Sequence, residues 1–291
     1  MNIAIRIINF SLMITIPFVL GLFLAGKLKS EWRLFGIGAL TFISSQCFHI
    51  PFNYWVLNPI VTNLNLPSNF RMLPHAVIGL IFGLSAGLFE EVFRWVGFRF
   101  WIKGERDWKS ALMFGAGHGG IESILLGVLA LYGFIQALSL RGTDLNIVVG
   151  IEQAPIVQAQ IDAYWAAPWH LSILGAVERF STILFHLSAS VFVLQVFLRK
   201  NILWLFLAVG WHTLVDAVAV FASRIWSPYI TEAIILFLGL LSLGFVFILK
   251  PGGKQRIQTP GMDQSDSFER PKIEIQQIKP SEEDLENSKY A

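Results

Sequence analysis

Long apolar runs separated by short polar connections dominate the first 250 residues of this chain. Several runs reach 18 residues or more, a length typical of membrane-spanning helices. The pattern predicts an all-α, polytopic helical membrane domain over residues 1–250 with about seven transmembrane helices. We place the spans at 3–26, 33–51, 75–98, 110–137, 169–198, 201–222 and 226–249.

The composition agrees with a membrane domain followed by a polar tail. The chain is 54% hydrophobic and 14% charged, and eight of its 20 acidic residues fall in the last 41 positions. The rest of the chain is therefore poorer in charge than a soluble domain of its size. Residues 251–291 are rich in Gln, Ser, Glu and Pro and lack a packing face, so we predict a disordered tail there.

Basic residues are divided unevenly between the two sets of connections, with nine on one side and three on the other. The positive-inside rule places the nine in the cytoplasm, so we expect the N-terminus outside and the C-terminal tail inside. The nine are Lys27, Lys29, Arg33, Arg99, Lys103, Arg106, Lys109, Arg199 and Lys200, and the three are Arg71, Arg141 and Arg224.

We therefore expect a multi-pass protein of the plasma membrane, in contact with the lipid bilayer. The net charge of +2 gives no indication of a nucleic-acid partner, and we expect none. The chain has one cysteine, Cys47, which excludes an internal disulfide and a multi-cysteine metal site. The first apolar run is long and lacks a small-residue cleavage site, so we expect a retained helix rather than a signal peptide.

Ionisable side chains interrupt four consecutive predicted spans, where a lipid-facing helix carries none. The stretch "GLFEEVFRW", from Gly87 to Trp95, is one example, whereas spans one, two and seven carry almost nothing polar at depth. The ionisable residues are Glu90, Glu91 and Arg94 in span three, His118 and Glu122 in span four, Glu178, Arg179 and His186 in span five, and His212 and Asp216 in span six.

The free energy of inserting these charges indicates a function. A charge at the bilayer centre costs about 2.5–3.5 kcal/mol on insertion scales, so seven unpaired acids and arginines would cost on the order of 20 kcal/mol. This exceeds a typical folding stability of about 5–15 kcal/mol. The residues must therefore pair, become neutral or line a hydrated cavity, and intramembrane ionisable residues are by default functional.

Helical spacing predicts how these side chains are directed. Glu90 and Arg94 are four residues apart and share a helix face, whereas Glu90 and Glu91 lie about 100° apart. One glutamate can thus bind Arg94 while the other faces a cavity. Counted from the cytoplasmic helix ends at ~1.5 Å per residue, Glu91, His118, His186 and His212 all lie roughly 10–18 Å deep. We expect one layer in the cytoplasmic half, with Glu178 further out.

A carboxylate and several imidazoles in a hydrated pocket can activate water. Glutamate acts as a general base, and histidine shares the proton, binds a metal or donates to an oxyanion. A serine in a nucleophile elbow is absent and Cys47 has no catalytic neighbour on these helices, so direct attack by water fits best.

The residues leave two versions of this chemistry open. Three histidines with a carboxylate can form a zinc site with one open position, although the motif H-E-x-x-H is absent. A metal-free version uses a glutamate and His118 on water, with His212 and Asp216 on the oxyanion. The candidate metal ligands are His118, His186, His212, Glu122 and Asp216.

Three segments carry a resemblance to a known group of proteins. "EEVFR", "FGAGH" and "HTLVD" are similar to the motifs of the CAAX-processing and bacteriocin-processing intramembrane proteases, which are a double glutamate followed by arginine, F-x-x-x-H and H-x-x-x-N or D. The double glutamate with its arginine, "GHGGIE" and the "ER…H" of span five resemble the YhfC family of intramembrane metalloproteases more closely. The resemblance covers roughly residues 5–250.

The resemblance implies a membrane endopeptidase that cleaves a membrane protein or peptide. It assigns water activation to Glu90, the second motif to His118 and the third to His212 and Asp216. The larger group spaces its first motif E-E-x-x-x-R, whereas Arg94 stands one residue closer and is expected to face Glu90. Glu91 is then also a candidate base.

Two further departures from the larger group favour a metal. Asp216 replaces an asparagine that many relatives carry and is a better metal ligand, and His186 has no counterpart in the three-motif pattern. The chemistry of the prenylated CAAX substrate is not implied.

The same residues allow functions other than hydrolysis. In a non-catalytic membrane scaffold, the acids and histidines would only lock the helices together. A proton-coupled transporter can use chains of Asp, Glu and His, although broken helices and repeats are not evident in the sequence. Two histidines can also hold a haem. His49, His75 and His170 lie near predicted helix ends, and we expect no catalytic role for them.

Overall fold

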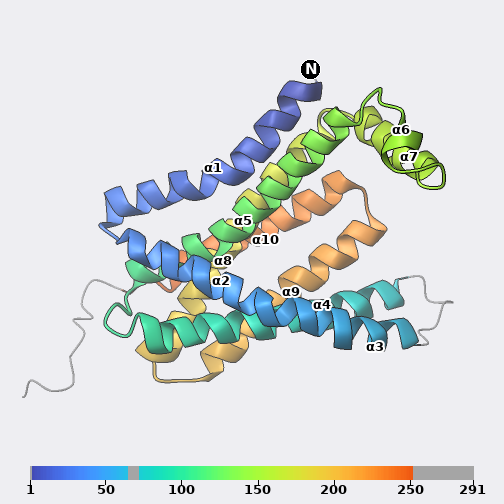
Figure 1. Ribbon diagram of the computed structural model, residues 1–291. Coiled ribbons are helices and arrows are strands. Elements are labelled where there is room, and N and C mark those ends of the chain that lie inside the picture. Colours follow the sequence, from blue (N-terminus) through green and yellow to red (C-terminus); the bar gives the residue numbers. More distant parts are fainter. Residues whose placement is uncertain (1, 65–71, 252–291) are drawn as a thin grey trace, which may run out of the picture. The chain divides into compact units, whose positions relative to one another are not determined.

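The computed structural model describes residues 2–64 and 72–251, so the predicted disordered tail lies outside the described residues except for Pro251. The described part is helical, without a strand, and seven helices are long and apolar enough to span a membrane. The prediction of a seven-helix, multi-pass membrane protein is thus confirmed. The long helices are α1 (Asn2–Leu28), α2 (Trp32–Phe52), α4 (Leu73–Val96), α5 (Trp108–Ser139), α8 (Leu174–Leu198), α9 (Leu203–Ile225) and α10 (Pro228–Ile248) (Figure 1).

The second span is longer than its sequence predicts. It continues beyond α2 through a π-helical turn, Asn53–Leu57 (η1), into α3 (Asn58–Asn63). The predicted end at residue 51 was wrong because the prolines nearby do not stop the helix. Pro51 lies within α2, and Pro59 occupies the first turn of α3, where a missing backbone N–H costs nothing.

The connection between α5 and α8 is also helical. It holds α6 (Leu145–Val148) and α7 (Ala154–Ala166), and a single turn, Leu171–Ile173 (η3), precedes α8. Arg6 of α1 fastens α7 to the bundle, since its Nη2 donates to the Tyr164 carbonyl oxygen at 2.6 Å. Its guanidinium also lies 4.0 Å from the centre of the Tyr164 ring.

Glycines at every fourth position bring α4 close to α9. A Cβ atom on Gly79 would lie 2.7 Å from the Ala217 carbonyl oxygen, and one on Gly83 would lie 2.6 Å from that of Thr213. Small residues at this spacing let membrane helices approach to backbone contact. Gly87 continues the series, since a Cβ there would lie 2.9 Å from the Val209 carbonyl oxygen, so Glu90 and Glu91 one turn further on are held close to α9.

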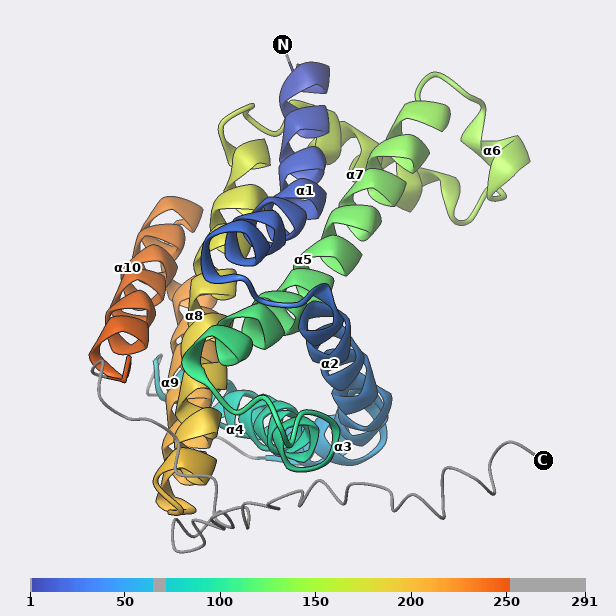
Figure 2. The same ribbon diagram turned by 90° about the vertical axis from the view of Figure 1, so that its left-hand side faces the viewer.

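The glycine-rich segment of α5 packs against neighbouring helices rather than leaving space for a substrate. A Cβ on Gly117 would overlap the backbone of Phe35 on α2, and one on Gly119 would lie 2.6 Å from the His186 ring on α8. Figure 2 shows α5 running between α2 and α8. The glycines of this segment therefore serve close helix packing.

Several basic connections meet at one end of the bundle, which we call the basic end. The α1–α2 and α4–α5 connections lie there, joined by the Arg33–Glu105 ion pair (Figure 1, left). The basic end is defined by the described residues Lys27, Lys29, Arg33, Arg99, Lys103, Arg106, Lys109, Arg199 and Lys200. Asp107 caps α5 at this end by accepting from the backbone N–H groups of Lys109 and Ser110.

Candidate functional site

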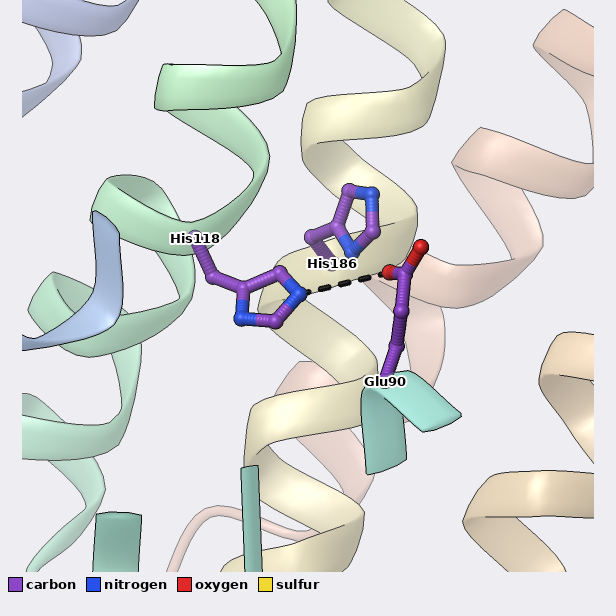
Figure 3. A group of neighbouring side chains, drawn as sticks. All are labelled: Glu90, His118 and His186. Atoms are coloured by element: carbon purple, nitrogen blue, oxygen red, sulfur yellow. Dashed lines mark hydrogen bonds and ion pairs between the residues drawn. The ribbon is translucent and has the colours of Figure 1, made fainter. Parts of the chain in front are cut away.

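Three of the predicted residues come together from three different helices. Glu90 of α4, His118 of α5 and His186 of α8 each offer a ligand atom within 4.8 Å of the others, and all three are buried (Figure 3). His212 of α9 joins them, because its Nε2 lies 3.9 Å from Glu90 Oε2. The four helices singled out by their charges therefore contribute to one cluster.

Glu90 is the carboxylate at the centre of this cluster. Its Oε2 lies 3.3 Å from His118 Nε2 (Figure 3). Its Oε1 accepts a hydrogen bond of 2.9 Å from Nε2 of Gln46 on α2. The residue is only 6% exposed, so these partners define its surroundings.

Arg94 pairs with Glu91 and not with Glu90, so the expectation from the spacing was wrong. Arg94 Nε donates to Glu91 Oε2 at 2.9 Å, and both side chains are fully buried. Residues three and four apart are both neighbours on a helix surface, and here the nearer one binds. Arg94 also donates to Ser190 Oγ at 2.7 Å and contacts His186 Nδ1 at 3.1 Å, which directs it toward α8.

Thr41 fixes which nitrogen of His118 faces Glu90. The Thr41 hydroxyl donates its single proton to the Gly38 carbonyl oxygen at 2.6 Å. It must therefore accept from His118 Nδ1, which lies 3.0 Å away. Because the proton of neutral His118 is on Nδ1, its Nε2 presents a lone pair to the Glu90 carboxylate.

His212 is oriented in the same way by a carboxylate. Glu91 is held by Arg94 as an acceptor, so His212 Nδ1 donates to Glu91 Oε1 at 2.8 Å. The far nitrogen of His212, Nε2, then lies 3.5 Å from Asp216 Oδ2 and 3.9 Å from Glu90 Oε2.

His186 uses both of its nitrogens in contacts with other side chains. Arginine can only donate, so His186 Nδ1 accepts from Arg94. Its Nε2 then carries the proton and donates to Glu122 Oε2 at 2.7 Å. His186 can bind a metal only by losing one of these partners, which distinguishes it from His118 and His212.

The arrangement around Glu90 favours a cation. A lone pair on His118 Nε2 and a carboxylate oxygen repel each other unless a proton or metal ion lies between them. Two imidazoles with a carboxylate form a donor set that zinc uses. The far nitrogens are already held by Thr41 and Glu91, as the imidazoles of metal sites usually are. The residues around Glu90 therefore fit a zinc-type ion.

A second group of charges lies beyond His186. Arg179 of α8 donates to Glu122 of α5 at 2.6 Å and also pairs with Glu178. Arg179 therefore binds two glutamates, one on α5 and one on its own helix. Glu122 thus links Arg179 to His186 with both of its oxygens engaged, so it is less suited than Asp216 to bind a metal.

The contribution of α2 to this cluster was missed in the sequence. Thr41 and Gln46 contact His118 and Glu90, although span two was expected to carry almost nothing polar. The polar run Ser44–Gln46 was the available signal. His49 was expected near a helix end, yet it is buried within the longer span and stacks on Phe89 with a ring separation of 5.4 Å.

Comparison with known proteins connects this geometry to a family. The family model described as "YhfC intramembrane metalloprotease" matches residues 12–236. A protein of Bacillus subtilis (strain 168) described as "Uncharacterized membrane protein YhfC" is 30% identical over 204 residues, which are 68% of this chain and 76% of the relative. No solved structure matches the chain. The family match includes every residue of the cluster.

Proposed function

Because this chain belongs to the YhfC family, we propose that this multi-pass membrane protein is an intramembrane endopeptidase that hydrolyses a peptide bond with activated water. The observation that carries the proposal is the contact between Glu90 and the unprotonated Nε2 of His118, buried where four membrane helices meet. Intramembrane ionisable residues are functional by default, and a carboxylate beside an imidazole lone pair suits proton transfer from water.

The chemistry follows from the positions of the side chains. Glu90 takes a proton from a water molecule, and the water oxygen attacks the carbonyl carbon of the substrate. In the metal-free version His212 is doubly protonated between Glu91 and Asp216, and its Nε2 donates to the oxygen that becomes negative. The C–N bond breaks as Glu90 returns the proton to the leaving nitrogen, which yields a carboxylic acid and an amine.

A metal ion would occupy the same cluster. We propose that zinc would be held by His118, His212 and Asp216, beside Glu90 as the base. When bound, zinc would polarise the carbonyl and lower the pKa of its water. His186 and Glu122 would then be supporting residues rather than ligands, because Arg94 and Arg179 engage them.

Arg94 and Glu91 position the cluster without touching the reacting atoms. Arg94 holds Glu91 and His186, and Glu91 in turn fixes His212. Since Glu91 is occupied by these two partners, we propose Glu90 as the base. The engagement of Glu91 by Arg94 and His212 supports this choice between the two glutamates.

The depth of the cluster indicates where the scissile bond is held. His118 lies ten residues after Trp108, the start of α5, so roughly 15 Å from the basic end. If the basic end is cytoplasmic, as the positive-inside rule predicts, hydrolysis takes place in the cytoplasmic half of the membrane. We propose a membrane protein or a membrane-tethered peptide as substrate.

A non-catalytic scaffold is the second candidate. The Arg179–Glu122 ion pair joins α8 to α5, and Arg94, which pairs with Glu91 within α4, reaches α8 through Ser190. Such contacts would suit a protein that only needs fixed helices. Such a protein does not need His118 Nε2 to face an unpaired carboxylate, so the protease is favoured.

Hydrolysis can be tested with purified protein in proteoliposomes that contain membrane-tethered peptides. Product masses should show one cleaved peptide bond, and His118→Ala should abolish cleavage while the protein remains monodisperse and helical. Absence of cleavage over a broad peptide panel, with intact folding, would favour the scaffold.

A further inference from the structure

Polar side chains continue along α2 from the cluster toward the end opposite the basic end. Gln46, His49 and Asn53 are three and four residues apart, so they lie on one helix face. Gln46 donates to Glu90, and Asn53 Nδ2 lies 2.9 Å from His49 Nε2. Ser85 of α4 closes this row, since its hydroxyl donates to Asn53 Oδ1 at 2.8 Å.

Asp216 of α9, next to His212, carries a partly exposed carboxylate deep within its helix. Its side chain is 37% exposed although it lies nine residues, roughly 13 Å, before the end of α9 at Ile225. A carboxylate at such depth faces protein or a water-filled cavity rather than lipid. The exposed part of Asp216, 3.5 Å from His212 Nε2, therefore faces water.

The opposite direction is closed by apolar side chains. Phe98, Met113, Phe114 and Leu194 are fully buried and belong to one apolar core that also contains Ile102. Phe98 and Ile102 follow Glu90 toward the basic end, and Phe114 precedes His118 by one turn on the same side. A polar molecule that approached from the basic end would have to cross this core.

We propose that α2, α4 and α9 form a hydrated entrance, lined by Gln46, His49, Asn53, Ser85 and Asp216, which leads to Glu90 from the end opposite the basic end. Water and an extended peptide segment enter along it, and the amides of Gln46 and Asn53 bind the peptide backbone. The site is thus reached from the side of the membrane that lies farther from it. The peptide part of this inference rests on the proposed hydrolysis, whereas the water part does not.

Cysteine accessibility tests the entrance directly. Cys47 is the one cysteine of the sequence, so Cys47→Ala gives a cysteine-free background. Asn53→Cys and Asp216→Cys place a thiol in the entrance. Matched controls on the same helices are Ile50→Cys, at 61% exposure, and Leu214→Cys, at 48% exposure, which face lipid.

The probe is a charged, membrane-impermeant thiosulfonate, added in the presence of a chelator to proteoliposomes of known orientation. From the side opposite the basic end, the two entrance thiols should react at least about tenfold faster than the two controls, because only a hydrated thiol forms the reactive thiolate. Denatured samples of all four variants should react alike, which verifies the thiols.

Equal rates for entrance and control thiols would overturn the entrance, and so would labelling only from the basic end. The test separates the two proposals because labelling needs no catalysis. Labelled entrance thiols in a protein that never cleaves a peptide would refute the protease and keep the hydrated entrance. Cleavage by a protein whose entrance thiols stay unlabelled would support the protease and refute the hydrated entrance.

A separate variant tests whether a peptide substrate enters along this path. Asn53→Trp fills the entrance about two helical turns beyond Gln46, which contacts Glu90. It should lower kcat/KM for a tethered peptide at least about tenfold, as misplaced substrates lose rate steeply. Zinc affinity should stay unchanged in this variant. An unchanged kcat/KM would show that peptides reach Glu90 by another way.

Discussion

Glu90 and His118 face each other, oxygen to nitrogen, across 3.3 Å where α4 meets α5. The contact is buried, and His118 presents the nitrogen that lacks a proton because Thr41 engages the other one. Arg94 neutralises the neighbouring Glu91 instead of Glu90. The two adjacent glutamates therefore have different roles: Glu91 pairs with Arg94, and Glu90 faces His118.

Thr41 is the side chain that sets the protonated nitrogen of His118. Thr41→Val keeps the shape but leaves a buried N–H without its acceptor, so we expect about a 10–100-fold loss of activity or zinc affinity, as for other supporting residues of metal sites. Thr41→Ser keeps the hydroxyl and should therefore keep most of the activity and zinc affinity that Thr41→Val loses. The rate of peptide hydrolysis and the zinc affinity are measured for both variants. Equal values for Thr41→Val and Thr41→Ser would contradict the role of the hydroxyl.

Glu91 should matter for folding more than for chemistry. Glu91→Gln leaves the guanidinium of Arg94 buried without its counter-ion, and breaking a buried pair in this way typically costs about 3–5 kcal/mol. We expect a clear fall in thermal stability in detergent. Glu90→Gln keeps the contact with Gln46 and should unfold near the wild-type temperature. A Glu91→Gln protein as stable as wild type would show that the ion pair is dispensable.

The close approach of α4 to α9 can be tested at Gly83. A Cβ there would lie 2.6 Å from the Thr213 carbonyl oxygen, so Gly83→Ala should destabilise the protein by about 1–3 kcal/mol through overpacking. Gly210 of α9 is the matched control because nothing lies within 4 Å of its added Cβ. Gly210→Ala should be neutral or stabilising by up to about 1 kcal/mol, since alanine favours helix. Similar melting temperatures for the two variants would contradict the packing.

Zinc binding should depend on the histidines unequally. Removal of His118 as a ligand should weaken zinc binding by more than about 100-fold, a larger effect than that of a supporting residue. His49→Ala removes a buried histidine outside the donor set and should leave the affinity unchanged. Titration of chelator-treated protein with zinc gives both values. Equal affinities for the His118→Ala variant and wild type would exclude His118 as a ligand.

The sequence predicts the spans and the membership of the cluster, but not its pairing. Long apolar runs require membrane helices, and the cost of burying charge requires Glu90, His118 and His212 to be accommodated together. The partner of Arg94 could not be read from spacing, because a helix brings residues three and four apart equally near. Which glutamate binds depends on α8, whose Ser190 and His186 direct the guanidinium.

The contribution of α2 was hidden for a different reason. Thr41 and Gln46 are neutral, so they do not stand out by the cost of inserting a charge, and their roles depend on tertiary contacts with α5 and α4. The sequence placed the end of this span at residue 51, whereas a π-helical turn after α2 carries the helix on to Asn63. No residue of α3 is buried, so packing of α3 does not explain this continuation.

The measurement that tests the central claim most directly is the rate of peptide hydrolysis by Glu90→Gln beside Glu91→Gln, in proteoliposomes and normalised to folded protein. The account predicts that folded Glu90→Gln loses about 10²–10⁴-fold in rate, the usual contribution of a general base, while the folded fraction of Glu91→Gln keeps more activity. A Glu90→Gln protein that cleaves as fast as wild type would contradict it.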